Sequence, residues 1–207
     1  ALAEALLPAA QAVCRDFPLK FPVRWLNKIP QGELHHPLLR QVLPIMDENE
    51  FVHGFNIDAV GDLQARQNPG ILHKYAGRVL LVATGACALH CRYCFRRHFP
   101  YSDNHAAKNQ WQDSLNYIQN HPDIHEVILS GGDPLALSNQ KILDLMTGLA
   151  QIAHVQTIRF HTRVPMVIPE RIDAGFCEIL KNTRLKKVMV LHANCAEEFD
   201  QDIQRAA

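Results

Sequence analysis

Three of the six cysteines in this chain lie within one short stretch of sequence. Cys87, Cys91 and Cys94 form a C-x3-C-x2-C pattern directly after the apolar run 78–83. A structural zinc ion takes four ligands, and no fourth Cys or His follows at zinc-finger spacing. Three thiolates can instead hold three irons of a 4Fe–4S cube and leave the fourth iron open. The pattern therefore predicts a loop that binds a thiophilic metal group.

This cysteine spacing resembles the signature of the radical S-adenosylmethionine (SAM) enzymes. In that superfamily the open iron binds the amino and carboxylate groups of the methionine part of SAM. Two other interpretations are an incomplete zinc site and chance clustering of buried thiols. Simple core packing is disfavoured because the same loop carries His90, Arg92 and Tyr93.

A second motif, Ser-Gly-Gly-Asp-Pro at 130–134, follows another apolar run. Paired glycines let the backbone come close to a ligand and accept positive φ, so the amides here can reach a small charged group. A Gly-Gly-Asp-Pro turn is also an ordinary loop. Placed behind the cysteine loop, it resembles the GGE-type motif of radical SAM enzymes, which contacts the SAM amino group.

Short apolar runs rich in β-branched residues predict strands at 78–83, 126–129, 157–161 and 187–191. Stripes of apolar residues at helical spacing lie between them, around 111–118, 142–149 and 172–180. Ser138 is placed to cap the second helix. This alternation predicts an α/β fold of βα units with a parallel sheet. Ligands collect at the carboxyl ends of such strands, so both motifs are expected on one rim.

Residues 1–73 are rich in proline, which excludes long helices. We expect an irregular helical lead-in there, with a short helix after Pro37, and we identify no chemistry in it. Residues 74–207 are expected to form the βα domain, as the first four units of an incomplete barrel. Because the chain lacks an initiator Met, we expect it to begin inside a longer one.

The composition indicates which kinds of molecule this protein is expected to bind. Lys plus Arg and Asp plus Glu number 21 each, so nothing indicates a nucleic-acid or acidic-membrane surface. No apolar run approaches the ~18 residues of a membrane span. Clustered free thiols indicate a reducing compartment, and we expect the protein in the cytoplasm with a small-molecule ligand.

Four motifs, in order, resemble the lysine 2,3-aminomutases, a radical SAM family that also uses pyridoxal phosphate (PLP). They are Lys74-Tyr75-Ala76-Gly77-Arg78, Cys94-Phe95-Arg96-Arg97-His98-Phe99, Ser130-Gly131-Gly132-Asp133-Pro134-Leu135 and Thr162-Arg163-Val164-Pro165. The run 91–101 is most similar to the bacterial branch whose β-lysine modifies translation elongation factor P. The resemblance extends from about Pro37 to the last residue and implies an incomplete radical-SAM βα barrel.

The resemblance implies an isomerase that interconverts L-α-lysine and β-lysine by moving an amino group between neighbouring carbons. Its implied cofactors are a 4Fe–4S cluster, SAM and PLP, with an external one-electron reductant. SAM cleavage supplies a radical that removes a hydrogen from lysine, while PLP holds the migrating amino group. In such enzymes the cofactors carry the chemistry and the protein positions them.

The resemblance also implies residue roles. Cys87, Cys91 and Cys94 would hold the cluster, and Arg96 would bind the substrate carboxylate through its bidentate fork. SAM would be contacted by Ser130, Gly131, Gly132, Asp133 and His192. The alternative for Arg96 is solvated surface charge, and for His192 a structural role at a strand end. After His192 the usual family pattern is replaced by Cys195-Ala196-Glu197-Glu198, which leaves the shape of this part of the site open.

PLP contacts are implied for Tyr75 and Arg78, although such residues also flank strands routinely. The PLP Schiff-base lysine stays unknown, because no lysine falls in the family's PLP-lysine context. The lysines are Lys20, Lys28, Lys74, Lys108, Lys141, Lys181, Lys186 and Lys187. We therefore expect a chain truncated at its C-terminus that is not fully active alone.

Two other functions stay open. One is a radical SAM enzyme without PLP, and the other is a non-catalytic module that binds a metal or an iron–sulfur cluster. Missing βα units would leave a sheet edge and apolar helix faces uncovered, so we expect the isolated chain to be marginally stable or to associate, for example as a homo-oligomer.

Overall fold

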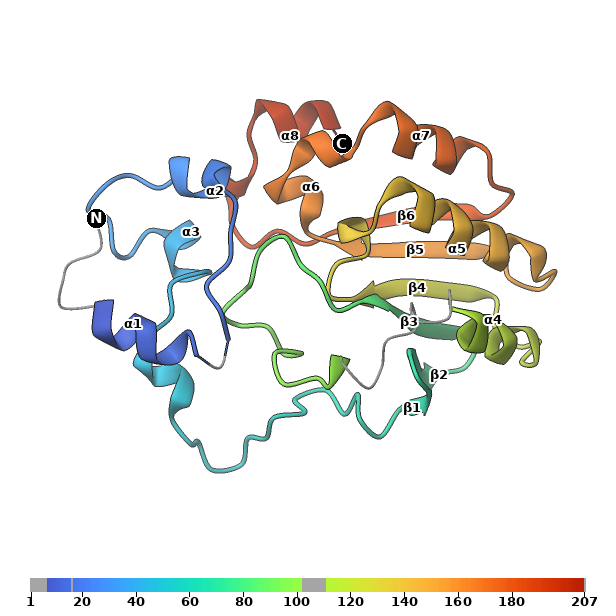
Figure 1. Ribbon diagram of the computed structural model, residues 1–207, viewed down its shortest axis with the longest axis horizontal. Coiled ribbons are helices and arrows are strands. Elements are labelled where there is room, and N and C mark those ends of the chain that lie inside the picture. Colours follow the sequence, from blue (N-terminus) through green and yellow to red (C-terminus); the bar gives the residue numbers. More distant parts are fainter. Residues whose placement is uncertain (1–6, 16, 102–110, 207) are drawn as a thin grey trace.

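The structure, a computed structural model, describes residues 7–15, 17–101 and 111–206. Its centre is one six-stranded sheet in which the strands stand in chain order (Figure 1). The strands are β1 (Arg66–Asn68), β2 (Ile71–Tyr75), β3 (Arg78–Thr84), β4 (Glu126–Gly131), β5 (Thr157–Thr162) and β6 (Lys186–Leu191). Strands β3 to β6 run parallel, whereas β1 and β2 form an antiparallel hairpin beside β3.

Short helices surround the sheet. The α-helices are α1 (Leu7–Val13), α2 (Val23–Asn27), α3 (Pro37–Arg40), α4 (Gln112–Gln119), α5 (Asn139–Gln151), α6 (Val164–Val167), α7 (Ala174–Lys181) and α8 (Gln201–Ala206). Single 3-10 turns are η2 (Met46–Asn49), η5 (Pro134–Ala136), η6 (Pro169–Arg171) and η7 (Ala196–Glu198). None of the helices in the described part of the chain is both long enough and apolar enough to cross a membrane.

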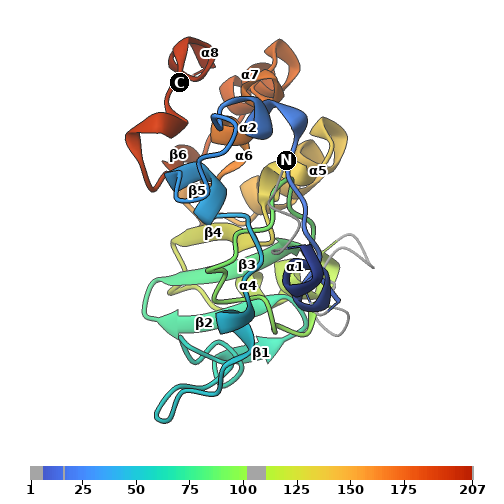
Figure 2. The same ribbon diagram turned by 90° about the vertical axis from the view of Figure 1, so that its left-hand side faces the viewer.

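The helices form two groups around the sheet. Helices α4, α5 and α7 pack on one face of the sheet through a shared core, and α5 stands to the right of the strands in Figure 2. Helices α1, α2 and α3 stand beyond the carboxyl ends of the parallel strands, on the left in Figure 1. The N-terminal lead-in therefore faces the edge of the sheet at which ligands are expected.

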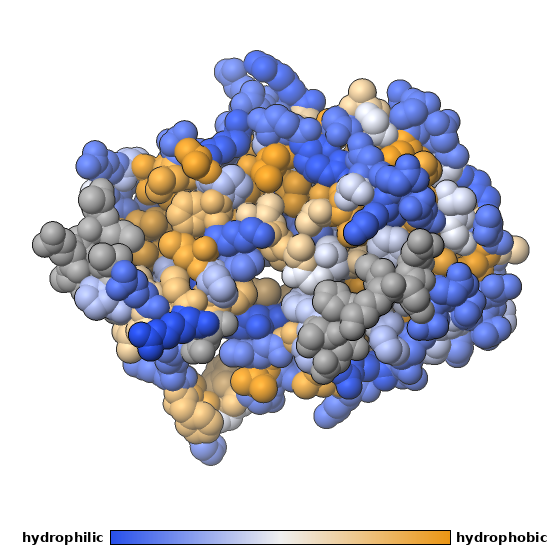
Figure 3. All heavy atoms as spheres, in the orientation of Figure 1, coloured by the Kyte–Doolittle hydropathy of each residue, from blue (hydrophilic) through white to orange (hydrophobic). Residues whose placement is uncertain are grey.

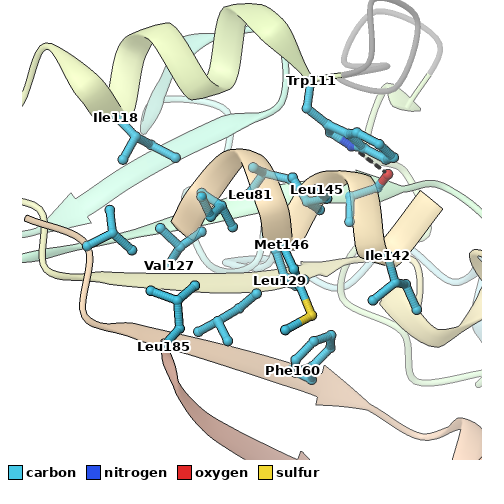
Figure 4. Packing of buried hydrophobic residues seen from close by; sticks show 14 of the residues in the cluster. Leu81, Trp111, Ile118, Val127, Leu129, Ile142, Leu145, Met146, Phe160 and Leu185 are labelled. Atoms are coloured by element: carbon cyan, nitrogen blue, oxygen red, sulfur yellow. Dashed lines mark hydrogen bonds between the residues drawn. The ribbon is translucent and has the colours of Figure 1, made fainter. Parts of the chain in front are cut away.

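Side-chain alternation along the strands decides which face becomes the core. Residues that point toward the helices are at most 1% exposed, among them Val79, Leu81, Val127, Leu129, Ile158 and Phe160. Helix α5 packs on them with Ile142, Leu145, Met146 and Leu149 (Figure 4). The indole of Trp111 closes one end and donates to the carbonyl oxygen of Ala83 at 3.3 Å. Burial of each large apolar side chain contributes about 1.5–3 kcal/mol, so this layer is the main source of stability.

The βα pattern read from the sequence is confirmed. All four expected strands and all three expected helices form, and the Ser138 hydroxyl accepts a hydrogen bond from the amide of Lys141 at 3.4 Å. The short helix after Pro37 is also present as α3. The α/β fold class is confirmed as well, with a mostly parallel sheet that is not closed across the described residues.

The expectation of a helical lead-in up to residue 73 is wrong for its last part. Strands β1 and β2 lie there, and the expected division at 73/74 falls inside β2. The hairpin turns at Pro69 and Gly70, where Gly70 has φ +90°. Ile71 and Leu72 are buried against β3. A Pro-Gly pair followed by two apolar residues is a turn-and-strand signal, but two buried residues are too few to show a period.

Replacement of Leu145 by Ala tests the core layer. Leu145 is 0% exposed, so the variant leaves a cavity and should lower the free energy of unfolding by about 2–5 kcal/mol. Leu143→Ala on the same helix is the control, because Leu143 is 40% exposed and its loss should change stability by no more than about 0.5 kcal/mol. Urea unfolding followed by circular dichroism measures both. Equal losses in the two variants would contradict this packing.

Candidate functional site

A cavity lies at the carboxyl ends of the parallel strands, where they meet the cysteine loop, defined as residues 84–97. Its volume is about 560 Å3, and a hollow is visible near the centre of the molecule in Figure 3. Its lining includes Cys87, Cys91, Cys94, Arg96, Ser130, Gly131, Gly132, Asp133, His161, Arg163 and His192. The structure thus brings the cysteine loop, the 130–133 turn and the ends of β5 and β6 around one space.

The alternation of strand residues explains which side chains enter the cavity. Leu129 faces the helix layer, so its neighbour Ser130 faces the opposite side of the sheet. In β5, Phe160 likewise faces the helix layer, so its neighbour His161 faces the cavity, beside Val190 of β6. The face of the sheet that α4, α5 and α7 leave uncovered therefore supplies one wall of the site.

The three cysteine thiols lie in surroundings that affect their pKa values and hence their ability to bind metal. Burial, the Asp133 carboxylate and the two other cysteines raise the pKa of Cys87 to about 12. Burial is also the largest cause that raises the pKa of Cys94. Bound iron cations would offset this penalty on the thiolates.

A single metal ion fits the site less well than a cluster. Among the residues that the structure describes, no group of three His, Cys, Asp or Glu converges closely enough to hold one metal ion. A 4Fe–4S cube takes one thiolate per iron, so thiols that share a cavity without meeting at one point suit it. The donor set therefore fits the cluster better than a structural zinc ion.

The glycines of the 130–133 turn serve contact between two loops. The amide of Gly132 donates to the Thr84 oxygen at 2.7 Å, and the amide of Asp133 donates to the Ala86 oxygen at 2.8 Å. A Cβ on Gly132 would stand 2.4 Å from the Ala86 oxygen. Gly131 has φ +108°, which favours glycine. The expectation that the paired glycine amides reach a ligand is wrong for Gly132, because the Thr84 oxygen already accepts its hydrogen bond.

Asp133 points into the protein. Its carboxylate accepts hydrogen bonds from the Thr162 hydroxyl at 2.6 Å and from the amides of Arg163 at 2.7 Å, Val164 at 3.1 Å and Leu135 at 3.0 Å. Burial raises the pKa of Asp133 despite these four donors. The carboxylate therefore ties the turn after β4 to the turn after β5, and the expectation that it faces the methionine end of SAM is not supported by its contacts.

Arg96 lines the cavity and is held by two partners. Its Nε donates to the Asp62 carboxylate at 2.6 Å, and its Nη1 donates to the Ser130 hydroxyl at 3.2 Å. Lys74 Nζ pairs with the same Asp62 at 2.5 Å. Burial would raise the pKa of Asp62, but Lys74 and Arg96 outweigh it and the pKa lies below its usual value. Asp62 was missed from the sequence, because nothing local links it to residue 96.

Two further cavity residues come from the ends of β5 and β6. His192 lines the cavity, and its ring packs edge-on against Tyr93 of the cysteine loop, with centroids 5.9 Å apart. Arg163 is 6% exposed and donates to the sulfur of Cys91 at 3.0 Å. Arg163 belongs to one of the four family-like motifs but was given no role from the sequence, although a lone charge in an apolar run is a signal for one.

Tyr75 and Arg78 are not brought to this cavity. They pair with each other at the amino end of β3, opposite the end that carries the cysteine loop. Tyr75 is 67% exposed, and Arg78 faces Glu126 with Nε 3.7 Å from its carboxylate. A cofactor that shares the cavity with the cysteines is beyond their reach, because the length of β3 separates them. The expected PLP contacts are therefore not supported here.

The cavity also offers no lysine among the described residues. Lys108, one of the eight lysines, lies outside the described part of the chain. The described residues that line this cavity thus fit the cluster, and no lysine among them could anchor PLP.

Acidic and aromatic residues of the lead-in hold the cysteine loop from outside. Arg92 is 7% exposed, and its Nε and Nη2 donate to the Glu48 carboxylate at 2.9 and 2.6 Å. Arg97 donates to the same carboxylate at 2.7 Å. Both guanidinium groups stack on Phe17, with 4.9 Å to the ring centroid in each case. No chemistry was predicted for this segment, whereas in the structure it supplies the partners of the loop.

Comparison with known proteins agrees with this geometry. A family profile described as the Radical SAM superfamily matches residues 81–193. The matched region contains the cysteine loop, the 130–133 turn and strands β4 to β6.

Two similar proteins are both named L-lysine 2,3-aminomutase. The chain is 46% identical over 187 residues to the L-lysine 2,3-aminomutase of Haemophilus influenzae, covering 89% of this chain and 55% of that protein. It is 41% identical over 204 residues to the L-lysine 2,3-aminomutase of Escherichia coli, covering 99% of this chain and 59% of that protein. The predicted resemblance is confirmed, and the chain spans little more than half the length of these relatives.

Gly132→Ala tests whether the two loops must touch. The added Cβ would meet the Ala86 backbone, so the cysteine loop must move, and such overpacking costs typically about 1–3 kcal/mol. We expect lower thermal stability and loss of most of the iron bound after anaerobic reconstitution. Gly148→Ala is the control, because its Cβ would meet only the flexible end of Leu115 at 2.7 Å, far from the site. Iron binding that survives in Gly132→Ala at the wild-type level would contradict a required contact between the loops.

Proposed function

The chain belongs to the radical SAM superfamily, and from this premise we propose that it is the cluster- and SAM-binding part of a lysine 2,3-aminomutase. The reaction would interconvert L-α-lysine and β-lysine by moving an amino group between neighbouring carbons. One observation carries the proposal: three cysteine thiols and a positioned arginine line the same cavity. Relatives named L-lysine 2,3-aminomutase support the choice of reaction.

Cys87, Cys91 and Cys94 would hold a 4Fe–4S cluster. A cluster held by these thiolates would supply the electron for reductive cleavage of SAM, with an external donor as the source of that electron. Cys87 and Cys94 are partly buried, which limits the access of water to their sulfur atoms. Tight contact with the 130–133 turn fixes the backbone of the loop.

SAM would lie between the cysteine loop and the ends of β4 and β6. The Ser130 hydroxyl and the His192 ring line this side of the cavity and are the side chains that we assign to it. Gly131 and Gly132 would shape the wall, since any Cβ there meets the loop. Asp133 would act indirectly, because it orders the turn after β5.

Arg96 would bind the substrate carboxylate. A guanidinium is suited to this because it presents parallel donors and keeps its charge. Asp62 and Ser130 occupy Nε and Nη1 and so fix the plane of the group. The orientation is set before substrate arrives, which lowers the entropy lost on binding.

The finer parts of the proposal come from the resemblance. A PLP requirement and a role of the β-lysine product in modifying elongation factor P are implied by the family, and we assign PLP no residue in this chain. A reducing compartment such as the cytoplasm suits an enzyme with clustered thiols.

The first test is 5′-deoxyadenosine formation from SAM. The complete polypeptide that carries this sequence is reconstituted with iron and sulfide, reduced, and compared with Cys94→Ala. We expect product from the native protein and at least a roughly 100-fold loss in the variant, because one cluster ligand is missing. Iron and sulfide at full occupancy without SAM cleavage would instead indicate a metal-binding module. SAM cleavage without PLP absorbance and without β-lysine would indicate a radical SAM enzyme of another kind.

The second test is Arg96→Lys. Loss of a bidentate, charge-assisted contact of about 1.5–3 kcal/mol should weaken lysine binding roughly 10- to 150-fold while iron content stays unchanged. Arg97→Lys is the matched control, since Arg97 pairs with Glu48 outside the cavity. Isotope-labelled lysine binding and KM measure the effect. An unchanged KM in Arg96→Lys would remove Arg96 from the substrate site.

A further inference from the structure

The buried, positively charged guanidinium of Arg163 lies next to the sulfur of one of the three cysteines. Its Nη1 donates to the Cys91 sulfur at 3.0 Å, and the residue is 6% exposed. Cys91 accepts this hydrogen bond from an arginine side chain, whereas Cys94 lies in the electrostatic field of Arg96 and Arg97. A role for this contact rests on the proposed cluster at these cysteines.

Residues from both ends of the chain fix the guanidinium of Arg163. Its Nη2 donates to the Glu198 carboxylate at 3.1 Å and also to the side-chain oxygen of Gln41. Its Nη1 also donates to the Tyr93 hydroxyl. The plane stacks on Trp25 at 4.9 Å from the ring centroid. Glu198 is 0% exposed, Trp25 1% and Gln41 7%, so water has little access to these three contacts, whereas Tyr93 is 46% exposed.

The backbone of Arg163 is fixed as well. Its amide donates to the Asp133 carboxylate at 2.7 Å, next to the amide of Val164. The 130–133 turn that supports the cysteine loop therefore also fixes the position of the Arg163 backbone. The direction of the side chain toward Cys91 is determined at both ends.

Burial of a charged guanidinium costs desolvation free energy, so its presence here indicates that the charge has a function. Two buried charges lose hydration, and ion pairs such as Arg163 with Glu198 often add no net stability. A compact point charge such as Lys could not contact Cys91, Tyr93, Gln41 and Glu198 together, whereas the arginine fork does.

We propose that Arg163 is a positioning residue for the cluster. Through its hydrogen bond to Cys91, Arg163 raises the reduction potential of the cluster. Reduction adds one electron from an external low-potential donor and makes no bond to Arg163. The added negative charge is spread over the cluster and its thiolates, so a fixed cation on Cys91 stabilises the reduced form more than the oxidised form. Hydrogen bonds to ligand sulfurs and the nearby charge are recognised controls of iron–sulfur potentials.

The test is a redox titration of the reconstituted complete polypeptide, followed by electron paramagnetic resonance of the reduced cluster. Arg163→Gln removes the charge and should lower the reduced-to-oxidised ratio at fixed potential about tenfold, which is a midpoint about 59 mV more negative for a one-electron couple. Arg163→Lys keeps the charge but not the fork and should shift the midpoint in the same direction by less. Arg171→Lys is the matched control, because Arg171 is also partly buried, donating to the Leu135 and Leu137 oxygens, and is not among the residues that line the cavity.

The outcomes separate this inference from the proposed function. If native protein binds a cluster and cleaves SAM while Arg163→Gln titrates at the native midpoint, the inference fails and the proposed function stands. If the Gln variant does not fold, the Lys variant decides, and a native midpoint there overturns the inference. Loss of the cluster in both variants with native circular dichroism would also overturn it, since Arg163 would then serve assembly. If native protein binds no cluster, both proposals fall.

Discussion

The backbone of the cysteine loop rests directly on the turn that follows β4, and this contact organises the site. Two amides of the turn donate to oxygens of the loop, and a Cβ at Gly132 would stand 2.4 Å from the Ala86 oxygen. Because no other residue type fits, the glycines hold the loop close to the sheet. The positions of Cys87, Cys91 and Cys94 depend on this closeness, since the loop is short.

The same turn connects the cysteines to the next strand. Asp133 accepts from the Thr162 hydroxyl and from the amide of Arg163, and Arg163 returns to the Cys91 sulfur. A closed path of hydrogen bonds therefore links the ends of β4 and β5 with the loop after β3. Paired donors and acceptors make a buried network of this kind rigid, and within the described residues the Nε of Arg163 is the atom of this guanidinium that has no hydrogen-bond partner. Rigidity of the ligands matters for a metal cluster, whose geometry tolerates little movement.

The lead-in completes the site from the opposite side. Glu48 forms ion pairs with Arg92 and Arg97 on the cysteine loop, and Asp62 holds Arg96 in the cavity. These pairs are largely buried, so removal of either acid would leave a charge with little access to water. A segment without long regular elements thus supplies counter-charges that the sheet itself does not provide. Its irregularity is consistent with this role, because loops can bring isolated side chains to fixed points on a scaffold.

Features that depend on neighbours in the chain could be read from the amino-acid sequence alone. Apolar runs predicted strands β3 to β6, helical stripes predicted α4, α5 and α7, and cysteine spacing predicted the cluster loop. Pairs that join distant residues, such as Arg163 with Cys91 and Asp62 with Arg96, emerged only in three dimensions. The fold also separated Tyr75 and Arg78 from the cavity, because motif order does not say which end of a strand a residue occupies. Periodicity and spacing record local geometry, whereas a charge is buried beside its partner only once segments 34 and 72 residues apart have packed together.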